Sequence, residues 1–215
     1  GQIWYNTTTQ TLKVAPLIGA WASSTAINTG RRALFGQYIG TTTSALIAGG
    51  LKAGYSPEAS GKATETEEWN GSSWTESGDL STARDSQAGF GVQTAAVISG
   101  GQLPPTNESK ATEEYNGSSW ANGEDLPIYR AYCSGTGTLT AGLIAGGGTS
   151  PGGVPGTGSI TNVTHEYDGT DYTVGGAVNT TRSRIGLVGT QTAGLKFAGG
   201  NPGYVGPTES YDGST

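Results

Sequence analysis

The chain is poor in the residues on which cross-linked and metal-dependent proteins rely. Its 215 residues include one cysteine, one histidine and no methionine, and only 13% are charged. Because Cys133 is alone, an internal disulfide framework is excluded, and we expect this thiol to be a buried small apolar residue. His165 by itself does not supply the set of imidazole ligands that a copper centre uses. We therefore expect no metal and no cofactor.

Positive charge is also scarce. The chain has 11 Lys and Arg against 17 Asp and Glu, which gives a formal net charge of −6. Proteins that bind nucleic acid neutralise phosphates with clustered cations, so we expect no nucleic-acid partner. No apolar run has the length of a membrane span, and no signal peptide is predicted, so we expect no membrane partner.

Helix is disfavoured by what the chain contains in abundance. Glycine makes up 38 of the 215 residues, serine and threonine are frequent, and no long stripe has the helical period. Each of these features raises the free energy of a helix. The sequence therefore predicts an all-β protein, with one compact domain because no linker interrupts the chain.

One pattern recurs four times. An aromatic residue precedes an arginine by ten residues, an apolar run then ends in a pair of glycines, and a threonine follows three residues before a second aromatic. The first aromatics are Trp21, Trp74, Trp120 and Tyr172; the arginines are Arg31, Arg84, Arg130 and Arg182; the glycine pairs end at Gly50, Gly101, Gly147 and Gly200; the threonines are Thr66, Thr112, Thr164 and Thr208. The repeats span residues 21–73, 74–119, 120–171 and 172–215.

Turn signals follow the second aromatic of each repeat. Asn70-Gly71, Asn116-Gly117, Asp168-Gly169 and Asp212-Gly213 come directly after Trp69, Tyr115, Tyr167 and Tyr211. Such pairs favour two-residue type I′ hairpins. We therefore expect Trp69 and Trp74, and their equivalents, to lie on paired strands.

These residues resemble the kelch repeat, whose pattern is an arginine, an apolar strand ending in Gly-Gly, a Glu-x-Tyr and a tryptophan. Glu67, Glu113 and Glu209 fill the glutamate position, and His165 replaces it once. The resemblance implies a β-propeller of four-stranded blades, an architecture with repeats of about 40 to 50 residues. The four repeats predict about four blades. The opening GQIWYNTTTQTLKV and the later LSTAR and EEYNGSSW segments are similar to repeat-bearing tail and fibre proteins of bacteriophages, especially marine ones.

The two ends of the repeat region bear on how such a propeller closes. Trp21 opens the first repeat on an expected outer strand, and Tyr211 lies on a strand that lacks this partner. We expect a closed ring in which these two strands pair, because this pairing removes both sheet edges. An open arc completed by a neighbouring copy, and a piece of a longer ring, are the alternatives.

The recurring residues favour a structural interpretation. The fixed position of each arginine and glutamate suits guanidinium groups that bridge strands or cap carbonyls. The aromatics, among them Trp74, Trp120 and Tyr172, are expected to pack between blades. Glycine-rich stretches such as Gly89-Phe90-Gly91 and Gly135-Thr136-Gly137 resemble phosphate loops, but a crowded inner strand explains them better.

Variation between repeats is the better guide to binding, since framework residues recur and binding loops diverge. It is largest between the glycine pair and the threonine, in residues 51–65, 102–111, 148–163 and 201–207. All four segments join equivalent strands and so emerge on one face. The candidate contacts are Tyr55, Glu58, Asn107, Glu108, Lys110 and Tyr204.

Two further features are candidates for roles outside the repeats. Residues 1–20 are expected to form a docking segment built on a β-hairpin, in which Ile3 and Tyr5 alternate with Trp4 and Asn6. Candidate glycosylation sequons occur at Asn6, Asn70, Asn107, Asn116, Asn162 and Asn179.

Together these observations predict a non-enzymatic structural or adhesive module of a virion, located extracellularly or on the particle, most simply a bacteriophage tail or fibre component. Its loop face would meet a cell-surface glycan or another virion protein. The alternatives are a self-assembling extracellular fibre subunit, whose partners are copies of itself, and a secreted carbohydrate-active enzyme. No catalytic group of carboxylates is recognised in the sequence.

Overall fold

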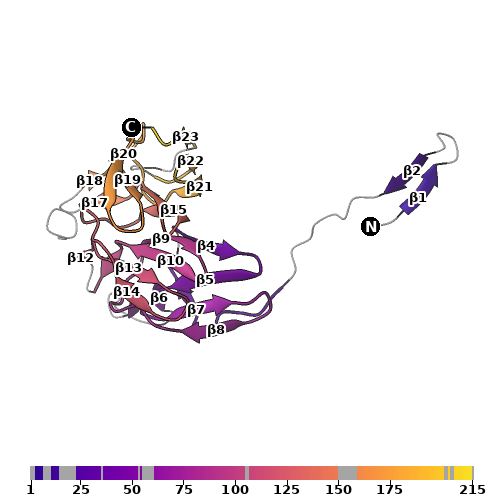
Figure 1. The fold of residues 1–215 in the computed structure, drawn as a ribbon, viewed down its shortest axis with the longest axis horizontal. Helices are drawn as coiled ribbons and strands as arrows, with labels where there is room; N and C mark the ends of the chain where they lie inside the picture. Colours follow the sequence, from indigo (N-terminus) through magenta and orange to yellow (C-terminus); the bar gives the residue numbers. More distant parts are fainter. Residues whose placement is uncertain are drawn as a thin grey trace.

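The computed structural model describes residues 3–6, 11–14, 23–34, 36–52, 54, 61–104, 107–149, 159–200, 203 and 206–214, with only the backbone described for 3–6 and 11–14. This part of the chain is all-β and contains no helix (Figure 1). The prediction of an all-β protein is confirmed at this level.

The expected N-terminal hairpin is present. Strand β1 (Ile3–Asn6) pairs antiparallel with β2 (Thr11–Val14), and Ile3 lies opposite Val14. The rest of the predicted segment 1–20 lies outside the described residues.

Four antiparallel sheets follow in chain order. The first sheet contains β4 (Gln37–Thr41), β5 (Ser44–Ala48), β7 (Thr66–Trp69) and β8 (Trp74–Ser77). The second contains β9 (Ala88–Val92), β10 (Ala95–Ser99), β13 (Thr112–Tyr115) and β14 (Trp120–Asn122). The third contains β15 (Ser134–Thr138), β16 (Ala141–Ala145), β19 (Thr164–Tyr167) and β20 (Tyr172–Gly175). The fourth contains β21 (Gly186–Thr190), β22 (Ala193–Phe197) and β23 (Glu209–Tyr211).

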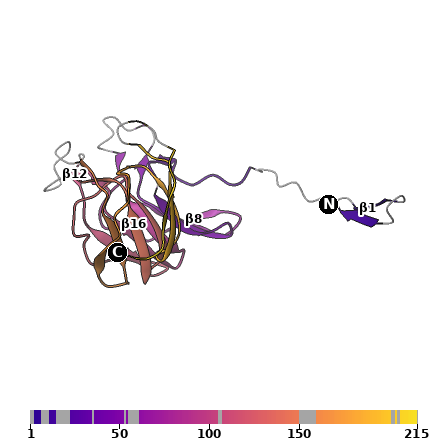
Figure 2. The same cartoon turned by 90° about the horizontal axis from the view of Figure 1, so that it is seen from above.

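The first strands of successive sheets lie side by side. Strand β9 packs against β4 and β15, and β15 packs against β21. Strands β4 and β9 pair in parallel, which joins the first two sheets into one curled eight-stranded sheet. Figure 1 shows the sheets following one another in chain order, from purple to yellow, and Figure 2 shows the same sheets from above. This arrangement is compatible with a β-propeller-like fold, although the described strands show no closed ring.

Three short strands directly follow glycine pairs and begin the segments that vary between repeats: β6 (Leu51–Lys52), β11 (Gln102–Leu103) and β17 (Gly148–Thr149). They pair respectively with β3 (Arg31–Arg32), β12 (Asn107–Glu108) and β18 (Ser159–Ile160).

The apolar core lies between neighbouring sheets. One cluster joins Leu46 of the first sheet to Ile98 of the second. The next joins Phe90 to Ile144 of the third sheet and includes the fully buried Cys133, as predicted for this thiol. Because neighbouring sheets bury apolar side chains between their facing surfaces, the hydrophobic effect holds the sheets together as a stack.

The turns after the second aromatics differ from the predicted type. Trp69 is the Cα partner of Trp74, so the expected pairing is confirmed, but the loop between them has four residues rather than two. Asn70 has no positive φ, which a type I′ turn would require. Instead, the Asn70 Oδ1 accepts hydrogen bonds from the backbone N–H groups of Ser72 and Ser73, each 2.9 Å long. The prediction of a type I′ turn is therefore wrong, because the side chain itself closes the turn.

The glycine pair of the fourth repeat is displaced by one residue from the predicted alignment. In the first three repeats the pair has φ values such as +66° at Gly49 and +97° at Gly50. In the fourth, the matching values are +56° at Ala198 and +92° at Gly199. Gly199, and not Gly200, is therefore the structural equivalent of Gly50, and Ala198 adopts the left-handed conformation in place of the first glycine.

The glycine-rich inner strands are structural. Gly91 has a φ of +112°, and a Cβ atom there would lie 2.3 Å from the Ala95 carbonyl oxygen. A Cβ at Gly135 would lie 2.7 Å from the Phe90 ring. Close approach of strands and sheets therefore accounts for both stretches without a phosphate ligand.

Candidate functional site

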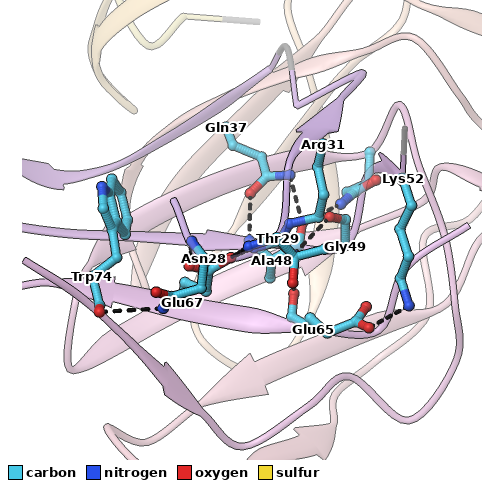
Figure 3. A network of polar contacts seen from close by, with 11 residues as sticks. Asn28, Thr29, Arg31, Gln37, Ala48, Gly49, Lys52, Glu65, Glu67 and Trp74 are labelled. Carbon is cyan, nitrogen blue, oxygen red and sulfur yellow. Dashed lines mark hydrogen bonds and ion pairs between the residues drawn. The ribbon is translucent and has the colours of Figure 1, made fainter. Parts of the chain in front are cut away.

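The repeated arginines form buried polar hubs inside the sheets. In the first repeat, Arg31 Nη2 lies 2.7 Å from Glu67 Oε1, and Nη1 donates to the carbonyl oxygens of Gly49, at 3.1 Å, and Glu65 (Figure 3). The second carboxylate oxygen of Glu67 accepts from the Asn28 backbone N–H at 2.6 Å. The hub thus ties the segment before the arginine to the second and third strands of one sheet.

A side chain also supports the first sheet beside this hub. Strand β4 pairs with β5 only at its end, and its earlier residues pair with β9. The Gln37 amide takes the place of the missing backbone pair: its Nε2 donates to the Ala48 carbonyl at 2.8 Å, and its Oε1 accepts from the Ala48 N–H at 3.1 Å (Figure 3). The polar groups of β5 therefore remain satisfied.

The same hub recurs in the second and fourth repeats. Its arginine–glutamate pairs are Arg84–Glu113 at 2.7 Å and Arg182–Glu209 at 2.6 Å, and its backbone donors are Ser81 and Asn179. Arg84 and Glu113 are each 1% exposed. Burial of these ions is tolerated because carboxylate, guanidinium and carbonyl groups satisfy one another.

The third repeat departs from the hub at two positions. His165 replaces the glutamate, and its Nδ1 lies 3.1 Å from Arg130 Nη1. Pro127 occupies the position three residues before the arginine, where the other repeats place a backbone N–H donor. Proline lacks that N–H. The acceptor and its donor are thus both absent from this repeat, while Arg130 still donates to the Val163 carbonyl.

Burial and neighbouring charge shift the pKa values at these hubs. Burial, with the adjacent Arg130 charge, lowers the pKa of His165 to about 4. Burial alone would raise the pKa of Glu209, but hydrogen bonds from Lys196 and Arg182 lower it to about 2. His165 is therefore neutral, and Glu209 ionised, at neutral pH.

Tyrosine–glutamate bridges connect successive sheets. A tyrosine on the third strand of one sheet donates its hydroxyl hydrogen to a glutamate of the sheet before it. The pairs are Tyr115–Glu68, Tyr167–Glu114 and Tyr211–Glu166. Burial, reinforced by Glu68, raises the pKa of Tyr115 to about 12, so this phenol remains a donor at neutral pH.

The first aromatics of the repeats also contact the preceding sheet. Trp120 Nε1 donates to Thr66 Oγ1 at 2.9 Å, and the Tyr172 hydroxyl bonds with Ser99 and lies 3.1 Å from Thr112 Oγ1. The paired rings within a sheet are close, with centroids 5.4 Å apart for Trp69–Trp74, 4.9 Å for Tyr115–Trp120 and 4.5 Å for Tyr167–Tyr172.

A ladder of left-handed residues runs across the four repeats, two positions after each arginine. Ala33, Ser86, Tyr132 and Arg184 have φ values of 60°, 59°, 57° and 55°. Each N–H donates to the carbonyl of the previous member: Ser86 to Ala33 at 3.2 Å, Tyr132 to Ser86 at 2.8 Å and Arg184 to Tyr132 at 2.9 Å. Left-handed backbone is costly for non-glycine residues and is often found at functional sites.

Beside this ladder lies a varied polar cluster, which we call the axial rim. It consists of the buried Lys62, Asp85 and Ser86 together with Tyr132 and Arg184. Asp85 pairs with Lys62 and accepts from the Ser86 hydroxyl at 2.6 Å. The Arg184 guanidinium lies 4.1 Å from the centre of the Tyr132 ring. Tyr132 is half-buried and Arg184 is exposed, so a stacked cation and a phenol face solvent beside a buried ion pair.

The candidate loop residues are only partly brought to this region. Asn107 is exposed, Glu108 is 8% exposed, and Lys110 Nζ lies 3.2 Å from Asp125 Oδ2 with both side chains 43% exposed. Glu108 and Asp85 both raise the pKa of Tyr132, although burial is the largest cause, so Glu108 is near the axial rim. Tyr55, Glu58 and Tyr204 lie outside the described residues.

Five candidate sequons lie at exposed positions. They are Asn70, Asn107, Asn116, Asn162 and Asn179. The amides of Asn70 and Asn116 also close their turns. Asn6 lies in β1, where only the backbone is described.

The axial rim was not found from the sequence. Apart from Lys62, which lies in the variable segment 51–65, its members follow the repeated arginines by one or two positions, outside the variable loops. A signal exists: the residues at this position are alanine, serine, tyrosine and arginine, whereas the arginine two positions earlier never changes. Variation beside a fixed residue would have indicated the rim.

The described residues contain neither a candidate metal site nor a candidate membrane-spanning helix. No group of three or more His, Cys, Asp or Glu side chains there is placed to hold a metal ion. No helix of the described chain has the length and apolar character needed to cross a membrane.

Comparison with known proteins supports the fold alone. No family model matches the sequence, and no curated protein matches it. Among solved structures, the chain is similar to one titled "Structure of YjhT", with a TM-score of 0.68 and 14% sequence identity. The likeness covers 95% of this chain and 70% of that chain.

Proposed function

We propose that the chain is a non-enzymatic, kelch-like β-propeller module of a virion, serving in a bacteriophage tail or fibre. The virion assignment is supported by the resemblance of its N-terminal segment and repeats to such proteins. The kelch assignment is supported by the recurring hubs, in which Arg31, Arg84 and Arg182 each bind a glutamate at the same position of the repeat. In this proposal the four sheets are blades.

The binding surface that we propose is the axial rim with the adjoining loops. One observation carries this proposal: the repeats keep their hub arginines and vary at the ladder position two residues later. A fixed framework with divergent side chains at equivalent positions is the pattern of a binding surface. Arg184 stacked on Tyr132 offers planar donors and an apolar ring face, and both suit a cell-surface glycan or a protein surface.

We also propose that the blades form an open arc rather than a ring closed within one chain. The fourth sheet supports this proposal, since Val188, Leu195 and Phe197 are 40%, 42% and 37% exposed. The same exposure favours the second candidate function, a self-assembling fibre subunit. In either role the protein acts extracellularly or on the particle.

Binding of the purified chain to immobilised host-surface glycans and to host cells tests the proposal. Tyr132→Ala and Arg184→Ala are expected to weaken binding at least tenfold. Lys110→Ala probes the adjoining loops, and Val174→Ala is the control because Val174 is 62% exposed on the outer strand β20. If the two rim variants bind as tightly as the control, the axial rim is not the binding surface. Hydrolysis of a glycan by the wild-type chain would contradict the non-enzymatic assignment.

A further inference from the structure

Each pair of neighbouring sheets meets through the same two faces. The leading face of a sheet, defined as the face toward the next sheet, carries Leu46, Phe90 and Leu143 in the first three sheets. The trailing face, toward the previous sheet, carries Ile98, Tyr167 and Leu187. These residues form the three apolar clusters between sheets, and all six are no more than 2% exposed.

The leading face of the fourth sheet has no cover among the described residues. Leu195 is equivalent to Leu46 and Leu143 but is 42% exposed. Val188, equivalent to Phe90, is 40% exposed, and Phe197 beside them is 37% exposed. The repeat itself indicates what such a face packs against, because in all three earlier cases the cover is the trailing face of another sheet of the same kind.

One trailing face is correspondingly uncovered, that of the first sheet. Tyr38 on β4 is 44% exposed, while its equivalent Leu187 on β21 is 1% exposed. Trp69 on β7 is only half-buried, whereas its equivalents Tyr115 and Tyr167 are 1% and 0% exposed. The first sheet therefore presents aromatic surface where the others are buried.

The polar bridge is modified on both of these faces. At the three observed junctions, a tyrosine of the trailing face donates to a glutamate of the leading face. On the uncovered trailing face the tyrosine is replaced by Trp69, and on the uncovered leading face the glutamate is replaced by Ser210. A glutamate facing a tryptophan would be a carboxylate without its phenol donor. Donor and acceptor are thus removed together, as a junction between these two faces requires.

The backbone ladder has matching open ends. Among the described residues, the Ala33 N–H and the Arg184 carbonyl take part in no ladder hydrogen bond, while every step between them is made. Within the described residues, the ladder therefore begins with a donor in the first repeat and ends with an acceptor in the fourth. A contact between the two faces can therefore extend the ladder in the same direction.

We propose that the fourth sheet of one copy docks on the first sheet of a second copy, head to tail. A second copy is favoured over closure within one chain because the first sheet is held elsewhere. Gly36, just before β4, accepts hydrogen bonds at its carbonyl from Gly89 at 2.8 Å and Gly135 at 3.2 Å, and a Cβ there would lie 2.3 Å from the Cys133 carbonyl oxygen. The start of β4 is thus fixed against the second and third sheets, leaving the fourth uncovered. A head-to-tail contact closes into a ring or continues as a filament.

Two variants and their mixture test the proposal, with mass measured by light scattering after size-exclusion chromatography. Leu195→Arg disrupts only the leading face of the fourth sheet, and Tyr38→Glu only the trailing face of the first. Each variant alone is expected to be monomeric, and Val92→Glu, at a position 49% exposed elsewhere, is the control that keeps the wild-type mass. Circular dichroism checks that each variant is folded.

The single variants and their mixture distinguish a head-to-tail contact from a contact between like faces. A Leu195→Arg copy retains an intact first sheet and a Tyr38→Glu copy retains an intact fourth sheet, so an equimolar mixture is expected to form a heterodimer. Association of one single variant by itself would show a contact between like faces, and a mixture that stays monomeric while the wild type associates would show that the first and fourth sheets do not pair. Either result would overturn the head-to-tail proposal. A wild-type chain that is monomeric at every concentration would also overturn it. Glycan binding by the axial rim does not depend on either result.

Discussion

Pro127 and His165 stand at the two positions where the other repeats place a backbone N–H donor and its carboxylate acceptor. Ser81 N–H donates to Glu113 Oε2 at 2.7 Å, and Asn179 N–H donates to Glu209 Oε2 at 2.7 Å. The third repeat lacks both partners. This relationship explains why a buried arginine persists beside a histidine, since neither substitution alone leaves a satisfied site.

A double-mutant cycle tests this coupling. His165→Glu alone gives Arg130 a carboxylate that lacks its backbone donor, and Pro127→Ser alone restores an N–H without an acceptor. Together they rebuild the hub, and we expect a favourable interaction of about 1–2 kcal/mol in the free energy of unfolding. Urea unfolding of the two single variants and the double variant measures it. Strict additivity would show that the positions are independent.

The lowered pKa of His165 predicts a specific acid response. Because the folded-state pKa is about 4, below the ordinary value of 6.5, the folded protein disfavours the protonated ring. The stability associated with neutral His165 is present above pH 6.5 and is lost as the pH falls toward 4. His165→Gln is expected to flatten this part of the stability curve. Glu209 serves as the comparison. Its folded-state pKa is lowered to about 2, so its contribution to the stability of the fold is lost only below pH 4.5. An unchanged slope between pH 6.5 and 4 in the variant would rule out the His165 assignment.

Removing a hub arginine should be far more costly than removing a surface cation. Arg84→Ala leaves the buried Glu113 carboxylate without its guanidinium, and we expect a loss of about 3–5 kcal/mol in the free energy of unfolding. Lys110→Ala removes one member of the exposed pair with Asp125 and should cost about 0–1 kcal/mol. Denaturant midpoints of both variants provide the comparison. Similar losses would mean that the hub does not carry the stability ascribed to it.

Two substitutions, one from alanine to glycine and one from glycine to alanine, test whether positive φ angles limit which residues these positions accept. Ala198→Gly relieves a left-handed alanine where the other repeats have glycine and should stabilise the fold by about 1 kcal/mol. Gly91→Ala should destabilise it, because its new Cβ would lie 2.3 Å from a carbonyl oxygen. Gly30→Ala is the control, since no atom lies within 4 Å of a Cβ there. Thermal unfolding ranks the three, and a destabilised Ala198→Gly would refute the alignment of Ala198 with Gly49.

Repetition made much of this fold readable from the sequence. The recurring turn signals predicted that the aromatics lie on paired strands, and Trp69 does pair with Trp74. It did not reveal the turn type at Asn70, because whether a side chain closes a turn depends on backbone angles that the residue pair does not fix. Repetition also misaligned Gly200. Either Ala198-Gly199 or Gly199-Gly200 fits the glycine pair of the other repeats, and only the φ angles distinguish the two alignments.

The candidate site was less predictable for a different reason. The hub arginines were visible because identical residues recur. Tyr132 and Arg184 were not, because their common property is a left-handed backbone shared by unlike side chains. The pairing of Tyr115 with Glu68 was also hidden, since it joins different sheets and depends on which face each residue occupies.

The most direct measurement is the mass of the wild-type chain in solution as a function of concentration, by light scattering. The account predicts association to at least twice the chain mass of 21.7 kDa, lost in Leu195→Arg and in Tyr38→Glu. A single mass of 21.7 kDa across the whole concentration range would contradict it.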